Sequence, residues 1–169
     1  MDSLEIHLTR LEAEDNGMPP MGFSVDVSED TWASLKFPDP ECYLRMSIGP
    51  SRSLSVIVAS YKSEIHGHDV LSRIIGRVFY NGRYIPLRAG KKTRVTLDGV
   101  ERIAQEFTTS RSANKKRWSA ALVPSPDGAP YGLLVAFGLR TGARRTSLLS
   151  VLDNPIHAGI AQSFALESS

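Results

Sequence analysis

The stretches 93–107, TRVTLDGVERIAQEF, and 118–139, WSAALVPSPDGAPYGLLVAFGL, decide the fold of this chain. In the first stretch, Asp98-Gly99 is a dipeptide that adopts the positive φ angles of a two-residue hairpin turn. Apolar residues flank this turn at the two-residue period of half-buried strands: Val95, Leu97, Ile103 and Phe107. The second stretch repeats the plan around a Pro-Ser-Pro-Asp-Gly turn. We therefore expect three antiparallel strands in a row across residues 93–139.

Other strands are expected on both sides of this centre. Alternating or apolar runs predict strands over residues 22–27, 43–48 and 54–61, with a closing strand over residues 163–166. Residues 2–15 fit both a short amphipathic helix and an edge strand, and their periodicity does not decide between the two.

One helix is clearly predicted, over residues 70–79. Its apolar residues recur at the i, i+1, i+4, i+5 spacing of a single buried face: Val70, Leu71, Ile74, Ile75, Val78 and Phe79. Asp69 is placed to cap its start, and Asn81-Gly82 ends it. A helix of one or two turns is expected over residues 146–152, and a helical turn over 156–161. The fold class that follows is α+β, an antiparallel sheet with helices packed on one face.

The totals indicate one soluble domain. A chain of 169 residues with a hydrophobic fraction of 41% can bury a core without staples. We divide it into an acidic N-terminal segment, residues 1–21, and a single α+β domain, residues 22–169. Cys42 is the only cysteine, and the N-terminus has neither a basic region nor an apolar run typical of a secretory signal. We therefore expect a cytoplasmic protein.

The charge is unevenly distributed along the chain. Residues 1–41 hold ten acidic and two basic residues, a net charge of −8, so the remainder carries +10. Solvated faces that neutralise each other in the fold explain this pattern. A basic surface that meets an acidic partner is the alternative explanation.

Nine basic residues form the candidate partner-binding set. They are Lys91, Lys92, Arg94, Arg111, Lys115, Lys116, Arg117, Arg144 and Arg145. Antiparallel strands bring alternate loops to the same sheet end, so residues 91–94 are expected near residues 111–117 or 140–145, forming a positive rim. Nucleic-acid binding would add exposed aromatic rings for stacking. The nearby aromatics are Tyr84 and Trp118, and Trp118 opens a strand where core packing is the better interpretation.

Catalytic and metal-binding patterns are weak. His66-Gly67-His68-Asp69 has alternate histidines, but no downstream cluster completes a set of three ligands. Nucleophile elbows and phosphate-binding loops are missing from the sequence, and Asp98, Glu101 and Glu106 are expected to point outward. We expect no catalytic residue, metal or cofactor. A cryptic small-molecule or metal-dependent enzyme that uses His66 and His68 is kept as an alternative.

Several motifs, in this order, resemble the PsbP/Mog-like fold and its bacterial DcrB-like relatives. They are Gly22-Phe23-Ser24-Val25 followed by Trp32, Ser53-Leu54-Ser55-Val56, the helix over 70–79, Leu97-Asp98-Gly99 with Ala104 and Phe107, Tyr131-Gly132-Leu133-Leu134, and Ser163-Phe164. The resemblance spans residues 22–166 and leaves the acidic segment outside. The proline that usually precedes the tryptophan is missing from Val27-Ser28-Glu29-Asp30.

The resemblance implies a largely non-catalytic protein. Members of this family are assembly factors, small-GTPase partners, lipoproteins, or chaperone-adaptors that shield hydrophobic segments of secreted type VI effectors. Because this sequence has no lipobox cysteine, the cytosolic adaptor branch fits better than the lipoprotein branch. We expect a cytoplasmic adaptor or chaperone that binds another protein with an acidic or hydrophobic segment. A basic nucleic-acid-binding domain is the alternative, and a homodimer is left open.

Overall fold

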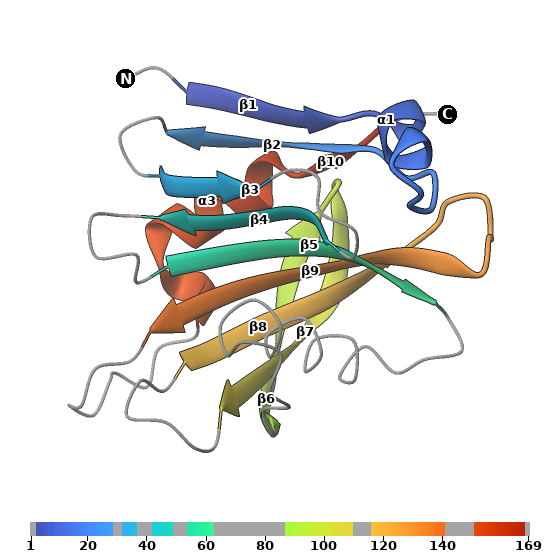
Figure 1. Ribbon diagram of the computed structural model, residues 1–169. Coiled ribbons are helices and arrows are strands. Elements are labelled where there is room, and N and C mark those ends of the chain that lie inside the picture. Colours follow the sequence, from blue (N-terminus) through green and yellow to red (C-terminus); the bar gives the residue numbers. More distant parts are fainter. Residues whose placement is uncertain are drawn as a thin grey trace.

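The computed structural model is mostly β-strand, arranged in two antiparallel sheets with few helices (Figure 1). The structure describes residues 3–28, 32–36, 42–48, 54–62, 87–109, 116–140 and 151–167. The strands are β1 Ser3–Leu8, β2 Phe23–Ser28, β3 Trp32–Lys36, β4 Cys42–Ile48, β5 Leu54–Lys62, β6 Leu87–Leu97, β7 Val100–Thr109, β8 Lys116–Pro124, β9 Tyr131–Arg140 and β10 Ala165–Leu166. The helices are α1 Arg10–Asp15, the 3-10 turn η1 Val151–Asp153, and α3 Pro155–Ser163. Within this part of the chain no helix is long and apolar enough to cross a bilayer.

The larger sheet has seven strands in the order β3-β4-β5-β9-β8-β7-β6. Its centre is the antiparallel meander that the sequence predicts, but the meander has four strands, β6 to β9, and not three. The predicted number of strands was wrong because the Asp98-Gly99 turn joins β6 to β7, and the Pro-Ser-Pro-Asp-Gly turn joins a separate pair, β8 and β9. The predicted pair over residues 43–48 and 54–61 is confirmed as β4 and β5, and β5 then pairs with β9.

The predicted hairpin turn at Asp98-Gly99 is confirmed. Both residues have positive φ, 54° at Asp98 and 72° at Gly99, and Leu97 pairs with Val100 directly across the turn. Aspartate and glycine are among the residues that adopt this backbone at low cost, and such a turn matches the twist of the strands it joins. The turn therefore fixes the register of β6 against β7.

The smaller sheet has the order β1-β2-β10. Residues 2–15, which fit both a strand and a helix, contain one of each, because Thr9 separates them. Its hydroxyl accepts a hydrogen bond from the Glu12 amide at 3.0 Å, and the Glu12 carboxylate accepts one from the Thr9 amide at 3.3 Å. This reciprocal capping box ends β1 and begins α1.

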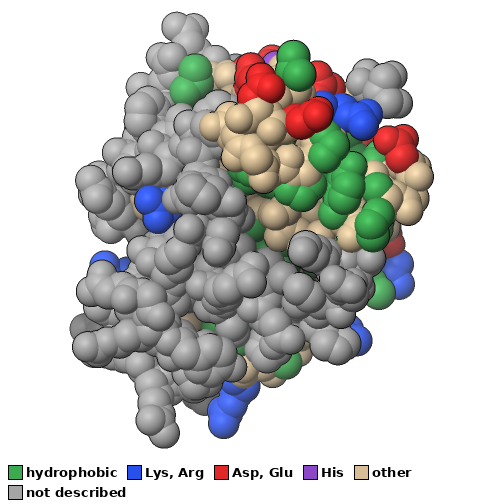
Figure 2. Space-filling view, turned by 45° about the vertical axis from the view of Figure 1, so that its right-hand side comes forward, with side chains coloured by type: hydrophobic (Ala, Val, Ile, Leu, Met, Phe, Trp, Pro, Cys, Tyr) green, Lys and Arg blue, Asp and Glu red, His purple; other side chains and the backbone are tan. Residues whose placement is uncertain are grey.

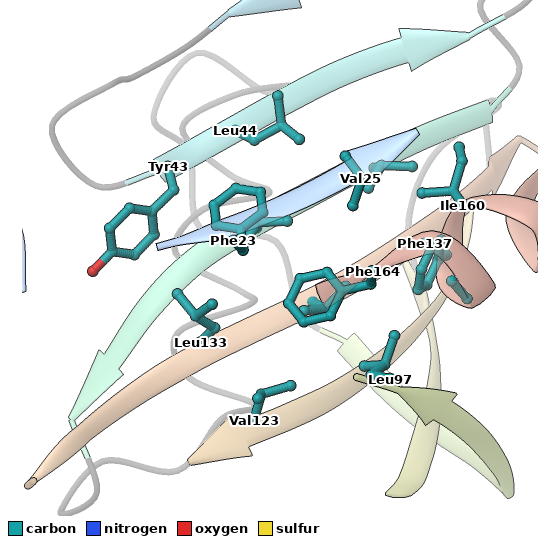
Figure 3. Packing of buried hydrophobic residues seen from close by; sticks show 14 of the residues in the cluster. Phe23, Val25, Tyr43, Leu44, Leu97, Val123, Leu133, Phe137, Ile160 and Phe164 are labelled. Atoms are coloured by element: carbon teal, nitrogen blue, oxygen red, sulfur yellow. The ribbon is translucent and has the colours of Figure 1, made fainter. Parts of the chain in front are cut away.

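One apolar cluster joins the two sheets (Figure 3). In the close-up, Phe23 and Val25 of β2 and Phe164 after α3 lie over side chains of the larger sheet such as Leu133 and Val123. Phe23 stacks on Phe164, with ring centroids 5.8 Å apart. The segment 3–21 belongs to the same core through a set of buried side chains: Ile6, Leu8, Ala13, Met18 and Met21.

The C-terminal helix is longer than the predicted turn over 156–161. Asn154 caps α3 by accepting a hydrogen bond from the Ile156 amide at 3.0 Å, and Pro155 occupies the first turn, where its missing N–H costs nothing. The helix contacts β2 and β6, and it runs to Ser163. The closing strand predicted over 163–166 is consequently shorter, Ala165–Leu166. Of the helix predicted over 146–152, residues 151–152 lie in η1, and the helix predicted over 70–79 falls outside the described residues.

The larger sheet also buries apolar side chains on its other face, which we call the outer face. Trp118 lies there, fully buried, as its predicted core role requires. Gly138 sits opposite Trp118 in the β8–β9 register, and a side chain at Gly138 would meet the Trp118 ring at 2.7 Å. Gly132 leaves room for the Tyr61 ring in the same way, because a side chain at Gly132 would meet that ring. The two glycines therefore leave room for two aromatic rings on this face.

Candidate partner-docking groove

A gap opens between β7 and β8 where their pairing stops. The register of these strands runs from Thr108–Arg117 to Ala104–Ala121, although β7 begins earlier, at Val100, and β8 continues to Pro124. In Figure 1 the β6–β7 hairpin turns away from β8 over this stretch. On the outer face of the sheet, a groove of about 470 Å³ runs from the paired part of β7 and β8 to this divergence, and we call it the β7–β8 groove. It is lined by Glu101, Arg102, Ile103, Gln105, Phe107, Ala120, Leu122, Pro124 and Leu134.

The β7–β8 groove has an apolar floor and aliphatic rims. Phe107, Ala120 and Leu134 are buried and belong to the outer-face cluster. Ile103 and Leu122, one on each strand, are 65% and 39% exposed. A single exposed aliphatic residue is ordinary, but two that face the same apolar gap form a surface that a partner can cover.

Basic side chains border this groove on the β6 side. Lys92 and Arg94 are exposed and pair in register with Gln105 and Ile103 of β7. Arg94 forms an exposed ion pair with Glu101, so the one carboxylate that lines the groove is matched by a cation. Arg102 adds a further positive charge, and its Nε is buried with no hydrogen-bond acceptor among the described residues.

Strand β6 is the edge of the larger sheet and is irregular at its centre. The β6–β7 register shifts between Ala89 and Lys92, which marks a bulge. The Gln105 amide holds the bulge, because its Nε2 donates to the carbonyls of Gly90 at 2.8 Å and Lys91 at 3.4 Å. A bulge and lysines on an edge strand oppose strand pairing from outside. The outer edge of β6 is therefore a poor docking site at this point.

The structure divides the predicted basic set. Lys91, Lys92 and Arg94 lie along β6, opposite residues 103–105. Lys116 pairs with Arg140 at the opposite end of the β8–β9 ladder from the 125–130 turn. The remaining residues, Arg111, Lys115, Arg144 and Arg145, fall outside the described residues.

Arg117 has a structural role. It forms an ion pair at 2.9 Å with Glu106, and the two side chains are only 17% and 7% exposed. The second carboxylate oxygen of Glu106 accepts a hydrogen bond from the Val151 amide at 3.3 Å. Asp98, Glu101 and Glu106 were all expected to point outward, and for Glu106 this expectation was wrong. The Arg117–Glu106 ion pair and the hydrogen bond to Val151 join η1 to β7 and β8.

Opposite charges are separated on the surface. Figure 2 shows acidic side chains gathered at the top of that view, and basic side chains mainly lower in it. The N-terminal elements carry five exposed acidic residues: Glu5, Glu12, Glu14, Asp15 and Asp26. The uneven charge of the sequence is thus also uneven in space.

A second cleft of about 320 Å³ lies where the chain's C-terminal strand meets α1 and the 125–127 turn. Its carboxylates are occupied by neighbouring groups. Glu167 accepts a hydrogen bond from the Arg10 amide, Asp98 accepts one from the Leu166 amide at 3.1 Å, and Asp127 pairs with the Arg10 guanidinium at 3.5 Å. These contacts hold the C-terminal strand against α1 and the 125–127 turn, so the carboxylates of this cleft have a structural role.

The histidines give no catalytic arrangement within the described residues. His66 and His68 fall outside them, and the described part of the chain contains no group of three residues suited to hold a metal ion. His157 is fully buried beside the ring of Phe137, and its Nδ1 lies 3.3 Å from the Val151 carbonyl. Burial lowers the pKa of His157 from 6.5 to about 4, so the ring is neutral near pH 7.

Comparison with known proteins adds little to this picture. No protein-family model and no curated protein matches the chain. Among solved structures, it is similar to the crystal structure of LpqN, a protein involved in cell envelope biogenesis of Mycobacterium tuberculosis. The two are 14% identical with a TM-score of 0.47, over 99% of this chain and 93% of LpqN. A likeness at this level carries no functional assignment.

Proposed function

We propose that this protein is a non-enzymatic protein-binding module, and that the β7–β8 groove docks an apolar segment of another protein. The observation that carries the proposal is the pair of exposed aliphatic rims, Ile103 and Leu122, above a buried apolar floor in a gap between diverging strands. An adaptor or chaperone for a secreted or assembling partner is the role that such a surface suits.

The energy of docking supports this choice. Full burial of one isoleucine or leucine side chain contributes about 1.5–3 kcal/mol. Ile103 and Leu122 are partly exposed in the free protein, so a partner that covers both gains a fraction of this at each. Phe107, Ala120 and Leu134 are already buried, so most of the area that a partner newly covers is on the rims.

The finer features of the fold belong to the same proposal. A PsbP/Mog-like arrangement with helices on one sheet face is supported by the contacts of α3 with β2 and β6 and by its buried Ile160 and Ala161. A cytoplasmic location is part of the same proposal, supported by the single cysteine, Cys42, which leaves the described chain without a disulfide.

Nucleic-acid binding is the weaker interpretation. The large hydrophobic side chains exposed in the described part of the chain are aliphatic, and Trp118 is buried. A single-strand binding surface needs exposed rings on which bases stack. The basic residues of β6 alone give electrostatic attraction, so loss of binding after nuclease treatment is the result that would favour this alternative.

The test is capture of partners from native lysate by the tagged full chain and two matched variants. Ile103→Glu places a charge on the groove rim, at a residue 65% exposed, so the fold should tolerate it. Leu11→Glu makes the same kind of change at a residue 66% exposed on α1, away from the groove. Lysates are treated with nuclease, and the captured proteins are quantified by mass spectrometry.

We expect specific proteins to be captured by the wild type and by Leu11→Glu, and to be depleted at least tenfold with Ile103→Glu. Equal capture by all three chains would remove the groove from the proposal. Loss of every partner with nuclease would replace protein binding with nucleic-acid binding.

A further inference from the structure

Strand β1 is the most regular sheet edge in the described part of the chain. The two sheets end in β1, β10, β3 and β6. Strand β6 has a bulge and two lysines, the register of β3 shifts between Trp32 and Ser34, and β10 has two residues. By contrast, β1 pairs with β2 without a break from Ser3 to Leu8, and it contains no proline, glycine or lysine. An edge strand without such features is open to pairing from outside.

The hydrogen bonds of β2 show which backbone groups of β1 are unpaired. The Gly22 carbonyl accepts a hydrogen bond from the Glu167 amide at 2.9 Å, and the Asp26 amide donates to Ser163 Oγ at 2.8 Å. Even-numbered residues along β2 therefore point toward β10 and α3. Because backbone groups alternate in direction along a strand, the odd-numbered residues of β2 point toward β1.

The backbone groups of Glu5 and His7 consequently point away from β2. The odd-numbered residues of β2 lie opposite the even-numbered residues of β1, among them Ile6. The N–H and C=O groups of Glu5 and His7 therefore point outward, where no described strand pairs with them. Thr9 follows the same alternation, because its amide donates to the Glu12 carboxylate and not to β2. In Figure 1, β1 lies along the upper margin of the fold, with no described strand beyond it.

The side chains of β1 alternate in the same way. Ile6 and Leu8 are buried in the core, whereas Glu5 and His7 are exposed. Glu5 lies opposite Asp26 of β2, which is also exposed, so two carboxylates are neighbours on one face. Within the described part of the chain, neither carboxylate forms an ion pair. A hydrogen-bond donor or a cation on the open side of Glu5 would offset this repulsion.

The sequence of β1 is complementary to itself. Residues 4–8, LEIHL, have leucines at equal distances from Ile6, and an acid and an imidazole at equal distances from it. Two antiparallel copies related by a two-fold axis at Ile6 therefore place Glu5 of one copy opposite His7 of the other, twice. An axis at Glu5 would instead oppose two carboxylates, and an axis at His7 would oppose two imidazoles. An imidazole donates a hydrogen bond to a carboxylate when neutral and adds a charge when protonated.

We propose that this protein forms a symmetric dimer in which the β1 strands of two copies pair antiparallel about a two-fold axis at Ile6. The two three-stranded sheets then form one continuous sheet in the order β10-β2-β1-β1-β2-β10. Glu5 and His7 of opposite copies exchange backbone hydrogen bonds, and their side chains pair on the exposed face. The dimer uses the smaller sheet, whereas the β7–β8 groove lies on the larger one, so this inference does not depend on the proposed function.

Exchange of the two polar residues tests the register. The mass of the full chain is followed by sedimentation from about 1 μM to about 1 mM, and circular dichroism confirms that each variant is folded. We expect Glu5→Lys and His7→Glu each to weaken the dimer about tenfold, because each opposes like charges across the axis. An equal mixture of the two variants, one of them fluorescently labelled, should form a heterodimer, since both cross-strand pairs then have opposite charges.

Two controls accompany this test. Ile103→Glu, at an exposed residue of the larger sheet, should leave the dimer dissociation constant unchanged. Amide exchange measured by NMR should slow about tenfold at Glu5 and His7 between dilute and concentrated samples. The Ile6 amide should change far less, because its backbone groups already point to β2.

Each failure has a distinct result. A monomer throughout the concentration range would overturn the inference, and protection of the Glu5 amide by another protein would then make that protein the occupant of the edge. A dimer that is lost in Ile103→Glu and indifferent to Glu5→Lys would place the interface at the β7–β8 groove, against pairing of β1. A dimer weakened by Glu5→Lys that the mixture with His7→Glu does not restore would overturn the register centred on Ile6.

Discussion

Gly138 shows how closely single residues are fitted in the larger sheet. It lies opposite Trp118, whose ring occupies the space that any side chain at this position would need. We predict that Gly138→Ala lowers the free energy of unfolding by about 1–3 kcal/mol, the usual cost of overpacking a core, in urea melts.

Gly159 provides the matched control for this substitution. Nothing lies within 4 Å of a side-chain carbon built at this exposed helical position. Gly159→Ala should therefore stabilise the protein by about 0.5–1 kcal/mol, since alanine is the better helix former. If Gly138→Ala were equally stabilising, the Trp118 ring could not lie against the Cα of Gly138 as described.

His157 makes stability depend on pH. The pKa of His157 is about 4 in the folded chain, below the ordinary value of 6.5. Between pH 6.5 and pH 4 the histidine is therefore protonated in the unfolded chain but neutral in the folded chain. Stability contributed by the neutral ring is therefore complete above pH 6.5 and is lost as the pH falls toward 4. The loss should approach about 3 kcal/mol, at about 1.4 kcal/mol per pH unit.

Urea melts at pH 7.5 and pH 4.5 measure this effect. His157→Gln should show a smaller loss between the two pH values than the wild type, whatever its stability at pH 7.5. His7→Gln, a change at an exposed histidine, should keep the full loss. An unchanged pH dependence in His157→Gln would assign the effect to other groups.

Glu106 marks the limit of residue-by-residue prediction. Its sequence neighbours give no sign of burial, and it stands in a strand whose other charged residues, Glu101 and Arg102, are exposed or partly exposed. Its place in the core is set by Arg117 on the next strand and by the Val151 amide, which is 45 residues away. Only the folded chain brings a charge and a donor to this carboxylate, which would otherwise be costly to bury.

At the scale of elements, local chemistry predicted turns better than it predicted boundaries. Asp98-Gly99 determines its hairpin by itself, because the backbone of that dipeptide favours the required turn. The start of β6 at Leu87, six residues before the predicted 93, depends on its partner β7, which supplies ladder hydrogen bonds to a stretch with little apolar pattern. The switch from β1 to α1 follows from the capping box at Thr9, a signal that is present in the sequence as Thr-x-x-Glu.

The β7–β8 groove could not be predicted from the pattern of either strand. Ile103 and Leu122 each fit an ordinary strand position in the sequence. The groove lies where the pairing of β7 with β8 stops at Ala104–Ala121, and the β6–β7 hairpin that continues past this point contacts α3, which is far away in the chain. Of the predicted binding residues, Lys92 and Arg94 lie beside this groove, whereas Arg117 forms an ion pair with Glu106.

At the scale of the whole molecule, Phe164 links the two sheets. It is 2% exposed, its ring stacks on Phe23 of the smaller sheet, and its carbonyl accepts a hydrogen bond from the Asp98 amide at 3.1 Å in the β6–β7 turn. We predict that Phe164→Ala costs about 3–5 kcal/mol of unfolding free energy. Leu11→Ala, at an exposed residue, should change it by less than about 0.5 kcal/mol.

The unfolding of the wild type should be a single transition, with circular dichroism and tryptophan fluorescence coinciding, because one apolar cluster includes both sheets. A cost near zero for Phe164→Ala together with two separate transitions would show that the sheets fold independently.

The sequence by itself determined the antiparallel meander, its tight turn, the burial of Trp118 and the excess of acidic residues near the N-terminus, because each depends on neighbours within a few positions. Tertiary structure alone decided that the acidic N-terminal segment contributes β1 and α1 to the common core, that Glu106 is buried, and that β7 leaves β8 to open a groove. These outcomes arise from contacts between residues far apart in the chain, where burial and charge pairing outweigh local preference.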